Sequence, residues 1–282
     1  MKYTQILCLI VLLGTAQGCS FHSRSNENPA AHYDGWVLTF QDEFNGEGAP
    51  DPDKWEVPEF NRRNNNDGPD GWWRKENAYQ DGAGNLVISV QKIENQNDDA
   101  DEFDYSSGAV RSLGKFEQRY GKFEIRCKLP AQPGWWVAFW LHSQSVGNVD
   151  STGAVSSGED GTEIDIMEGF GWTDKVQSAL HWDGYGKFHK SAGKSTVIDG
   201  IRDGYHTYTL EWDEAEYRFF VDGAETWRTT DGGVSKVPAY VKITGEIMTA
   251  GWAITDKWAN DPAKADYPDH YIIDWVRVYK KK

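Results

Sequence analysis

The chain has 282 residues, of which 44 are acidic and 29 basic, so its formal charge at neutral pH is −15. This charge repels polyanions and argues against binding to nucleic acid. Hydrophobic residues make up 39% and charged residues 26% of the chain, which is typical of a globular protein and not of a disordered or multi-span membrane protein. The 14 Trp, 13 Tyr and 12 Phe predict a rigid, aromatic-lined binding surface in addition to the core.

The first residues resemble an export signal. Lys2 precedes an apolar run over residues 6–13 that is too short to span a bilayer. Ala16-Gln17-Gly18-Cys19 has the shape of a bacterial lipoprotein processing site, although such sites usually carry Leu where Ala16 stands. We therefore expect a signal peptide over 1–18, a lipid on Cys19 and a flexible tether over 19–33. The alternative is plain secretion after cleavage near Gly18.

These expectations place the protein in the bacterial cell envelope, anchored by lipid to the outer membrane and exposed at the surface, or otherwise secreted. With Cys8 removed and Cys19 lipidated, only Cys127 remains, so no intramolecular disulfide is expected. No linker divides residues 34–282, which predicts one domain, and we expect a monomer.

A hydrophobic period of two predicts strands over 86–90, 122–129, 205–212, 217–221 and 271–279. The turn formers Asp81-Gly82, Asp222-Gly223 and Asp231-Gly232-Gly233 predict hairpins. Residues 257–264 are the one helix candidate. Many strands without a sustained helix predict an all-β fold, most naturally a jelly-roll β-sandwich of two stacked antiparallel sheets.

The acidic segment over residues 161–168 contains the candidate catalytic residues. On a strand, Glu163 and Asp165 share one face, while Ile164 and Ile166 point into the packed layer. Strict alternation would place Glu168 on the wrong face, but one extra residue in a β-bulge returns it to the acidic face. Three carboxylates in one row raise at least one pKa, a cost that a purely structural strand has little reason to bear.

Such a row suits hydrolysis of a glycosidic bond, which needs one carboxylate to attack the anomeric carbon and one carboxylic acid to protonate the departing oxygen. Retaining enzymes hold the two groups roughly 5–5.5 Å apart. Glu163 and Glu168 must therefore lean together, as a concave sheet allows, with Asp165 between them to orient the nucleophile. The alternative is a solvated strand face that is acidic by chance.

The segment resembles the signature of glycoside hydrolase family 16 in its bulged form, Glu-x-Asp-x-x-Glu. The resemblance implies that Glu163 is the nucleophile, Glu168 the general acid/base and Asp165 the assisting carboxylate of a retaining double displacement. It also implies a concave substrate cleft in one catalytic domain over residues 34–282. Further similar segments follow in the family's order at 42–44, 107–111, 120–124, 138–141, 206–212, 221–223 and 274–279.

The resemblance also assigns aromatic residues to the cleft. Trp140 is expected to form its floor beside the cleaved bond, where an apolar ring meets the C–H face of a sugar. Trp135 and Trp136 are the next candidates. Val137 stands where the family often has Pro, so the sequence leaves open which of these two contacts substrate.

Further contacts with the sugars are expected on both sides of the scissile bond, with polar contacts from Asn77 and Arg111. Trp172 and His181 follow the acidic strand closely and are predicted to contact sugars, with Asn77 and Arg111 on the other side. For each aromatic residue the alternative is core packing. His189 is given only a surface or structural role, the default for a single histidine.

No cofactor is expected for catalysis. Glu43 and Asp274 match positions at which many family members hold a structural Ca²⁺ away from the cleft, and the alternative is that both are ordinary surface acids. The sequence has no His-Glu-x-x-His and no Gly-x-Ser-x-Gly, so zinc hydrolysis and a serine nucleophile elbow lack their motifs.

The bulged motif is shared by enzymes with different substrates. The sequence favours endo-acting hydrolysis of a β-1,3- or mixed-linkage β-glucan. The missing Pro and the unusual segments 169–172 and 180–182 leave open an endo-β-galactanase acting on an agar-, porphyran- or mucin-type glycan. The net charge disfavours heavily sulfated chains unless Arg62, Arg63 or Arg74 offset it. A hypothesis of another class is a non-catalytic carbohydrate-binding protein, for which the acids would be dispensable.

Overall fold

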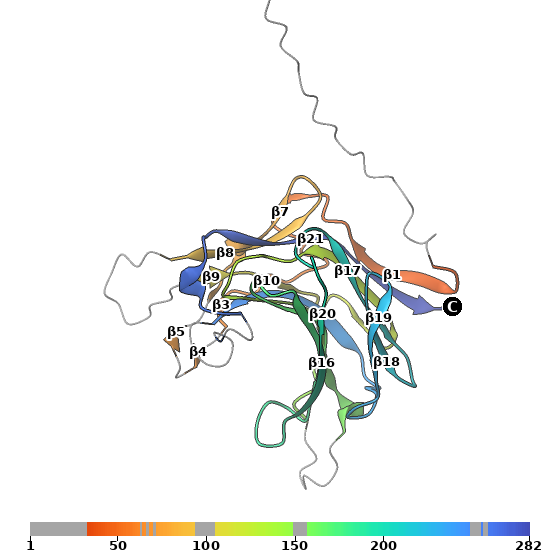
Figure 1. The fold of residues 1–282 in the computed structure, drawn as a ribbon. Helices are drawn as coiled ribbons and strands as arrows, with labels where there is room; N and C mark the ends of the chain where they lie inside the picture. Colours follow the sequence, from red (N-terminus) through yellow and green to blue (C-terminus); the bar gives the residue numbers. More distant parts are fainter. Residues whose placement is uncertain are drawn as a thin grey trace, which may run out of the picture.

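The computed structural model describes residues 33–62, 64–65, 68–69, 72–93, 105–148, 157–248, 255 and 259–282. The expected signal peptide, Cys19 and Arg63 lie outside these residues. Within them, almost all regular structure is strand, which confirms the predicted all-β class (Figure 1). No helix in this part of the chain is long and apolar enough to cross a bilayer.

The larger sheet contains both ends of the described chain. Trp36 pairs with Lys281, so the C-terminus lies beside the first strand (Figure 1). The described pairs are antiparallel apart from β6 with β9, which are parallel. The strands of the larger sheet follow the order β19 (Ala224–Thr229), β18 (Tyr217–Val221), β17 (His206–Trp212), β12 (Gly121–Lys128), β21 (Asp269–Lys281), β8 (Leu86–Lys92), β9 (Tyr105–Ser107), β6 (Trp72–Trp73) and β3 (Phe60–Asn61). Outside this order, β1 (Trp36–Asp42) pairs with β21, and β7 (Ala78–Asp81) pairs with both β8 and β2 (Glu47–Gly48).

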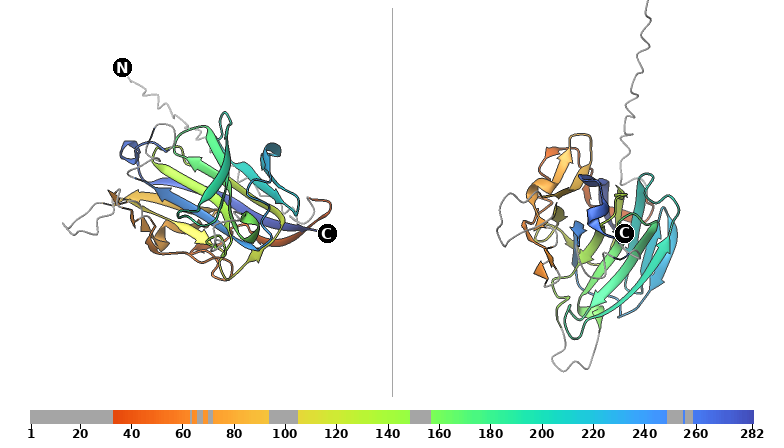
Figure 2. Two further views of the ribbon diagram at one scale, coloured as in Figure 1. Left: turned by 90° about the horizontal axis from the view of Figure 1, so that it is seen from below. Right: turned by 60° about the vertical axis from the view of Figure 1, so that its left-hand side comes forward.

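The smaller sheet carries the acidic segment and stacks on the larger one (Figure 2). Its order is β10 (Ala109–Arg111), β20 (Ala239–Ile247), β13 (Trp135–His142), β14 (Thr162–Phe170), β15 (Lys175–Trp182) and β16 (Lys190–Val197), with β11 (Glu117–Gln118) on β20. The remaining elements are the hairpin of β4 (Asn64–Asn65) and β5 (Gly68–Pro69) and the 3₁₀ turns η2 (Lys75–Asn77), η3 (Gly158–Asp160) and η5 (Pro262–Lys264).

The core fills the space between the two sheets. In β13, Trp135, Val137, Phe139 and Leu141 are fully buried in it. Because side chains alternate across a strand, the residues between them face the opposite side of the sheet. This alternation gives the smaller sheet one apolar face and one face free for function.

The turn predictions are confirmed at two of three places. Asp222 and Gly223 have φ of 49° and 79° and join β18 to β19, and Asp81-Gly82 lies between β7 and β8. The third prediction is wrong as a hairpin, because β19 and β20, which flank Asp231-Gly232-Gly233, belong to different sheets.

The helix predicted over 257–264 is also wrong where the structure describes it. Residues 257–258 lie outside the described part. Of the rest, only η5 is helical, as a single 3₁₀ turn in which the Asp261 side chain accepts a hydrogen bond from the Ala263 N–H (2.9 Å). Pro262 at the start favours this turn, and no apolar periodicity follows to extend it.

Phe139 offers a test of the packing. Replacing Phe139 by Ala is expected to cost about 3–5 kcal/mol of unfolding free energy, because it leaves a cavity between the sheets. Phe188, which is 43% exposed, provides the matched control, and Phe188→Ala should change stability by less than about 0.5 kcal/mol. Urea denaturation measures both, and equal losses would contradict the assignment of Phe139 to the core.

Candidate active site

A cavity of about 640 Å³ lies on the functional face of the smaller sheet. It crosses the strands from β20 through β13 and β14 to β15, and it is bordered by Phe60, Arg62 and Trp73 and by the connection 183–189. We call this cavity the cleft. Its lining residues are Phe60, Arg62, Trp73, Arg111, Trp136, Ala138, Trp140, His142, Glu163, Asp165, Glu168, Gln177, His181, Tyr185, His189, Lys242, Thr244 and Glu246.

The predicted β-bulge is present in β14. Asp165 pairs with Ala179 and Glu168 pairs with Gln177, so three steps along β14 lie opposite two steps along β15. The register with β13 shifts at the same place. The extra residue turns Glu168 to the face that carries Glu163 and Asp165, and all three line the cleft.

Burial changes the acidity of these three carboxyls. Burial, followed by the charges of Glu163 and Glu168, raises the pKa of Asp165 well above its usual range. Burial also raises the pKa of Glu163, against the hydrogen bond from Tyr185 and the charge of Lys242. Burial thus opposes ionisation of both carboxyls, and the neighbouring charges of Glu163 and Glu168 add to this effect at Asp165.

Glu168 has a carboxyl that titrates near neutrality. Burial raises its pKa to about 7, although two donors favour its ionised form. Trp136 Nε1 donates to Oε1 (2.9 Å) and Gln177 Nε2 donates to Oε2 (3.1 Å). A group of this kind can both give and take a proton at neutral pH.

Glu163 is held by a tyrosine from the connection 183–189. The Tyr185 hydroxyl donates to Glu163 Oε2 and lies 3.1 Å from His142 Nε2. The rings of Tyr185 and His142 stack, with centroids 6.4 Å apart and an interplanar angle of 20°. Burial, followed by the charge of Lys242, lowers the pKa of His142 to about 4, so its imidazole is neutral at pH 7.

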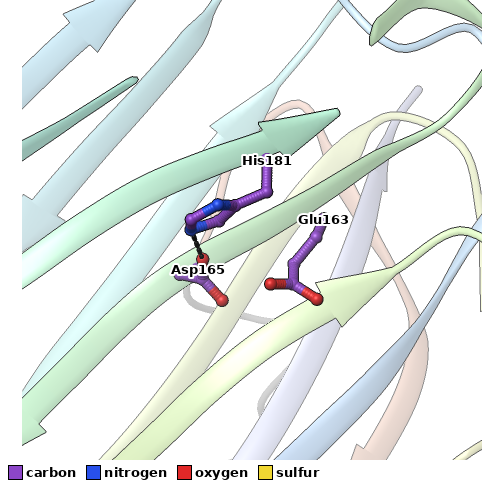
Figure 3. Close-up of side chains that lie close together, drawn as sticks. All are labelled: Glu163, Asp165 and His181. Atoms are coloured by element: carbon purple, nitrogen blue, oxygen red, sulfur yellow. Dashed lines mark ion pairs between the residues drawn. The ribbon is translucent and has the colours of Figure 1, made fainter. Parts of the chain in front are cut away.

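Asp165 faces a pair of stacked histidines. His181 Nε2 lies 3.4 Å from Asp165 Oδ2, and His181 Nδ1 lies 2.9 Å from His189 Nε2. Burial lowers the pKa of His181 to about 4, so its imidazole is neutral at pH 7. Figure 3 shows Glu163, Asp165 and His181 pointing toward one another from β14 and β15.

Cations line the β20 side of the cleft. Lys242 Nζ lies 3.6 Å from the centroid of the Trp140 ring, and Arg62 Nε lies 3.0 Å from Glu246 Oε1. Burial and the charge of Arg62 lower the pKa of Lys242 to about 7. Trp140 Nε1 donates to Thr244 Oγ1 (3.1 Å), so both the edge and one face of this ring have partners.

The geometry agrees with the comparison to protein families. The model for glycosyl hydrolases family 16 matches residues 65–277. The chain belongs to glycosyl hydrolase family 16. It is therefore a glycoside hydrolase with the jelly-roll sandwich that the strands predicted.

Relatives in this family act on different glycans. A β-glucanase of Rhodothermus marinus is 29% identical over 95% of this chain and 93% of its own length. A keratan-sulfate endo-1,4-β-galactosidase of Sphingobacterium multivorum is 30% identical over 87% of this chain. The solved laminarinase catalytic domain of Thermotoga maritima MSB8 matches with a TM-score of 0.70 at 29% identity, covering 88% of this chain and 100% of that domain. The chain spans 37% to 55% of the length of three curated relatives, including the galactosidase.

The structure places four of the predicted binding residues in the cleft. These are Trp136, Trp140, His181 and Arg111. Arg111 already forms a two-pronged ion pair with Glu56, with Nε to Oε2 at 2.9 Å and the terminal nitrogen to Oε1 at 2.7 Å. Its guanidinium is thereby fixed at the rim.

Three predicted binding residues do not line the cleft. Trp135 is fully buried in the core because it alternates with Trp136 along β13. Asn77 is also fully buried and donates to the hydroxyl of Ser89 (3.0 Å). Trp172 is 51% exposed in the turn after β14, outside the lining of the cleft.

Sequence reasoning missed several lining residues. Lys242, Thr244 and Glu246 alternate along β20 with the apolar core residues Val241, Ile243 and Ile247, and that period of two was available as a signal. Tyr185 comes from a connection without periodicity. His189, which was expected only at the surface or in a structural role, lines the cleft beside His181.

The carboxylates of the two predicted calcium ligands, Glu43 and Asp274, both pair with arginines. Both oxygens of Glu43 accept hydrogen bonds from Arg277 at 2.9 Å, and Asp274 forms an ion pair with Arg126. Each carboxylate thus already has a guanidinium partner, whereas Ca²⁺ needs six to eight oxygen ligands. Neither residue belongs to a cluster of three metal-binding side chains in the described part of the chain.

Tyr185 provides a test of how Glu163 is held. Its hydrogen bond lowers the pKa of Glu163, so Tyr185→Phe should raise that pKa. The acidic limb of kcat/KM against pH should then move to higher pH, because the carboxylate persists only above its pKa. Tyr33, whose hydroxyl donates to Glu124 Oε1 (3.0 Å) outside the cleft, gives the matched control Tyr33→Phe. An unmoved limb in Tyr185→Phe would argue against the contact.

Proposed function

We propose that the protein is an endo-acting, retaining hydrolase of internal linkages in a β-1,3- or mixed-linkage β-glucan. The observation that carries the proposal is the bulge in β14, which aligns Glu163, Asp165 and Glu168 along one wall of an open cleft. The resemblance of the chain to a β-glucanase over nearly its full length supports the choice of substrate.

In the proposed first step, Glu168 acts as a carboxylic acid and gives its proton to the glycosidic oxygen. The Glu163 carboxylate attacks the anomeric carbon as the bond to that oxygen breaks, which leaves a glycosyl ester on Glu163. Asp165 lies beside Glu163 on the same wall and orients its carboxylate. Tyr185 holds the same carboxylate from the other side.

In the second step, the ionised Glu168 takes a proton from water, and the oxygen of that water attacks the anomeric carbon. The ester bond to Glu163 breaks, and Glu168 regains the proton that it needs for the next turnover. The donors Trp136 and Gln177 stabilise its ionised form between the two steps. One residue thus serves as acid and base because its pKa lies near 7.

A second substrate class is a β-galactan. The similarity to a keratan-sulfate endo-1,4-β-galactosidase favours it, as do Lys242 and Arg62, which place positive charge beside the carboxyls of the cleft. Both cations lie near Glu246, however, and the Arg62 guanidinium is ion-paired to it. We therefore place the neutral glucan first.

A panel of glycans decides between these substrates. Laminarin, barley mixed-linkage glucan, lichenan, agarose and mucin glycans would be incubated with the protein, and the oligosaccharides released would be identified by mass spectrometry. Internal products from laminarin or mixed-linkage glucan are expected. Products from agarose or mucin glycans alone would transfer the proposal to the galactans, and binding without any products would favour the carbohydrate-binding hypothesis.

The nucleophile assignment predicts the effect of Glu163→Gln. The amide cannot form the ester, so kcat should fall at least about 10³-fold, while calorimetry should still detect binding of the glycan. Glu225, which is exposed on β19 and paired with Arg228, gives the control Glu225→Gln with unchanged activity. Turnover at the wild-type rate in Glu163→Gln would refute the assignment.

The assignment of Glu168 as the proton donor predicts how kcat/KM changes at alkaline pH. Glu168 must be protonated to act first, so kcat/KM should fall as the pH rises through about 7. Gln177→Ala removes a donor to the ionised form and should move this limb to higher pH. Gln144, which donates to Glu117 outside the cleft (2.7 Å), gives the control Gln144→Ala. A limb that Gln177→Ala leaves in place would assign it to another group.

A further inference from the structure

A metal-binding set of side chains lies inside the cleft. One ligand atom each from Glu163, Asp165 and His181 lie within 4.8 Å of one another, and no other such set of three occurs among the described residues. The three side chains, which come from β14 and β15, lie close together (Figure 3). Zn²⁺ binds carboxylate oxygens and imidazole nitrogens, so two carboxylates and one imidazole form a suitable set of ligands for it.

A second observation points to a ligand at the same place. Asp165 is only 5% exposed, yet its Oδ2 has no hydrogen-bond partner. A buried carboxylate oxygen without a donor is costly, and a cation would satisfy it. Oδ2 is the atom that faces His181 Nε2.

The spacing fits a tetrahedral ion. Asp165 Oδ2 and His181 Nε2 are 3.4 Å apart. Two ligands of a tetrahedral Zn²⁺ with bonds of about 2.0–2.2 Å lie roughly 3.3–3.6 Å apart. Tyr185 engages one of the two oxygens of Glu163, and a ligand oxygen of this carboxylate lies within 4.8 Å of the other two ligand atoms.

His181 is also held by a second residue. Its Nδ1 lies 2.9 Å from His189 Nε2, with the two rings stacked at 7°. When Nδ1 carries the proton and donates to His189, the lone pair of Nε2 points at Asp165 and is available to a metal. Metal-binding histidines are commonly oriented in this way through their other nitrogen.

We propose that Glu163, Asp165 and His181 bind one Zn²⁺ ion, with the fourth coordination position open to the cleft. The bound ion coordinates the Glu163 carboxylate, which is the proposed nucleophile, and occupies the space of the scissile bond. Zn²⁺ and the glycan therefore cannot bind at the same time. Binding of the ion stands on the geometry alone, whereas its inhibitory effect rests on the proposed function. Mg²⁺ and Ca²⁺ suit the site poorly because they prefer all-oxygen ligand sets with more members.

Calorimetry on the chelator-treated, dialysed protein tests the site with ZnCl₂, MgCl₂ and CaCl₂ as probes. One Zn²⁺ per chain is expected, with an increase in Tm at saturation, and only weak binding of the other two ions. His181→Ala should lower the Zn²⁺ affinity at least about tenfold, and His189→Ala by about 10- to 100-fold. Circular dichroism confirms that each variant is folded.

The matched control is His206→Ala. His206 Nδ1 lies 2.6 Å from Asp222 Oδ2 on the other sheet, so this variant removes a His–Asp pair while leaving the cleft unchanged. Its Zn²⁺ affinity should equal that of the wild type. Equal affinity of His181→Ala and wild type, or Mg²⁺ binding as tight as that of Zn²⁺, would overturn the proposal.

Measurements of hydrolysis distinguish a failure of the zinc site from a failure of the proposed function. The chelator-treated protein should cleave laminarin, and Zn²⁺ at ten times its Kd should slow that cleavage about tenfold at low substrate, with recovery after EDTA. Absence of cleavage in the metal-free protein counts against the proposed substrate and leaves the calorimetric result intact. Zn²⁺ binding without inhibition would place the ion elsewhere and overturn the assigned ligands.

Discussion

One extra residue in β14 determines the chemistry of this protein. Without the bulge between Asp165 and Glu168, the period of two would turn Glu168 into the apolar layer. The same displacement places Ile166 and Met167 in the core. A local irregularity of the backbone thus separates the groups that hold the sandwich together from those that face the cleft.

Glu163, Asp165 and Glu168 form an acidic wall of the cleft, and their carboxyls are costly to bury. Hydrogen bonds from neighbouring side chains offset this cost to different extents. Glu168 receives two hydrogen bonds, Glu163 receives one and faces Lys242, and Asp165 Oδ2 receives none. Burial raises the pKa of all three carboxyls, and hydrogen-bond donors oppose this rise only at Glu163 and Glu168. Two neutral histidines border the wall without adding charge at pH 7.

The sequence predicted the parts of the structure that follow from periodicity. Alternation in 161–168, combined with its phase error at Glu168, predicted both the strand and its bulge. The same rule applied to β13 would have excluded Trp135, which has the opposite phase to Trp136 and Trp140. On β20 it would have found Lys242 and Glu246. These misses reflect incomplete use of a signal that the chain contains.

Other parts could not be predicted from periodicity. Tyr185 and His189 reach the cleft from the connection 183–189, whose path depends on the pairing of β15 with β16. Asn77 was assigned to the cleft as a polar contact from the resemblance to the family, but it is fully buried, with Ser89 as its hydrogen-bond partner. The two hairpin turns were predictable from their residues. The third turn was not, because only the topology shows that the chain changes sheets there.

The position of β16 at the edge of the smaller sheet affects how the cleft can vary. This strand is largely exposed, and its lysines face solvent, which discourages pairing with another chain. Its hairpin with β15 nevertheless carries Tyr185 and His189. A peripheral hairpin can change length or composition while the apolar layer stays intact. Related chains can therefore acquire new glycan preferences at this border and keep the same folded scaffold.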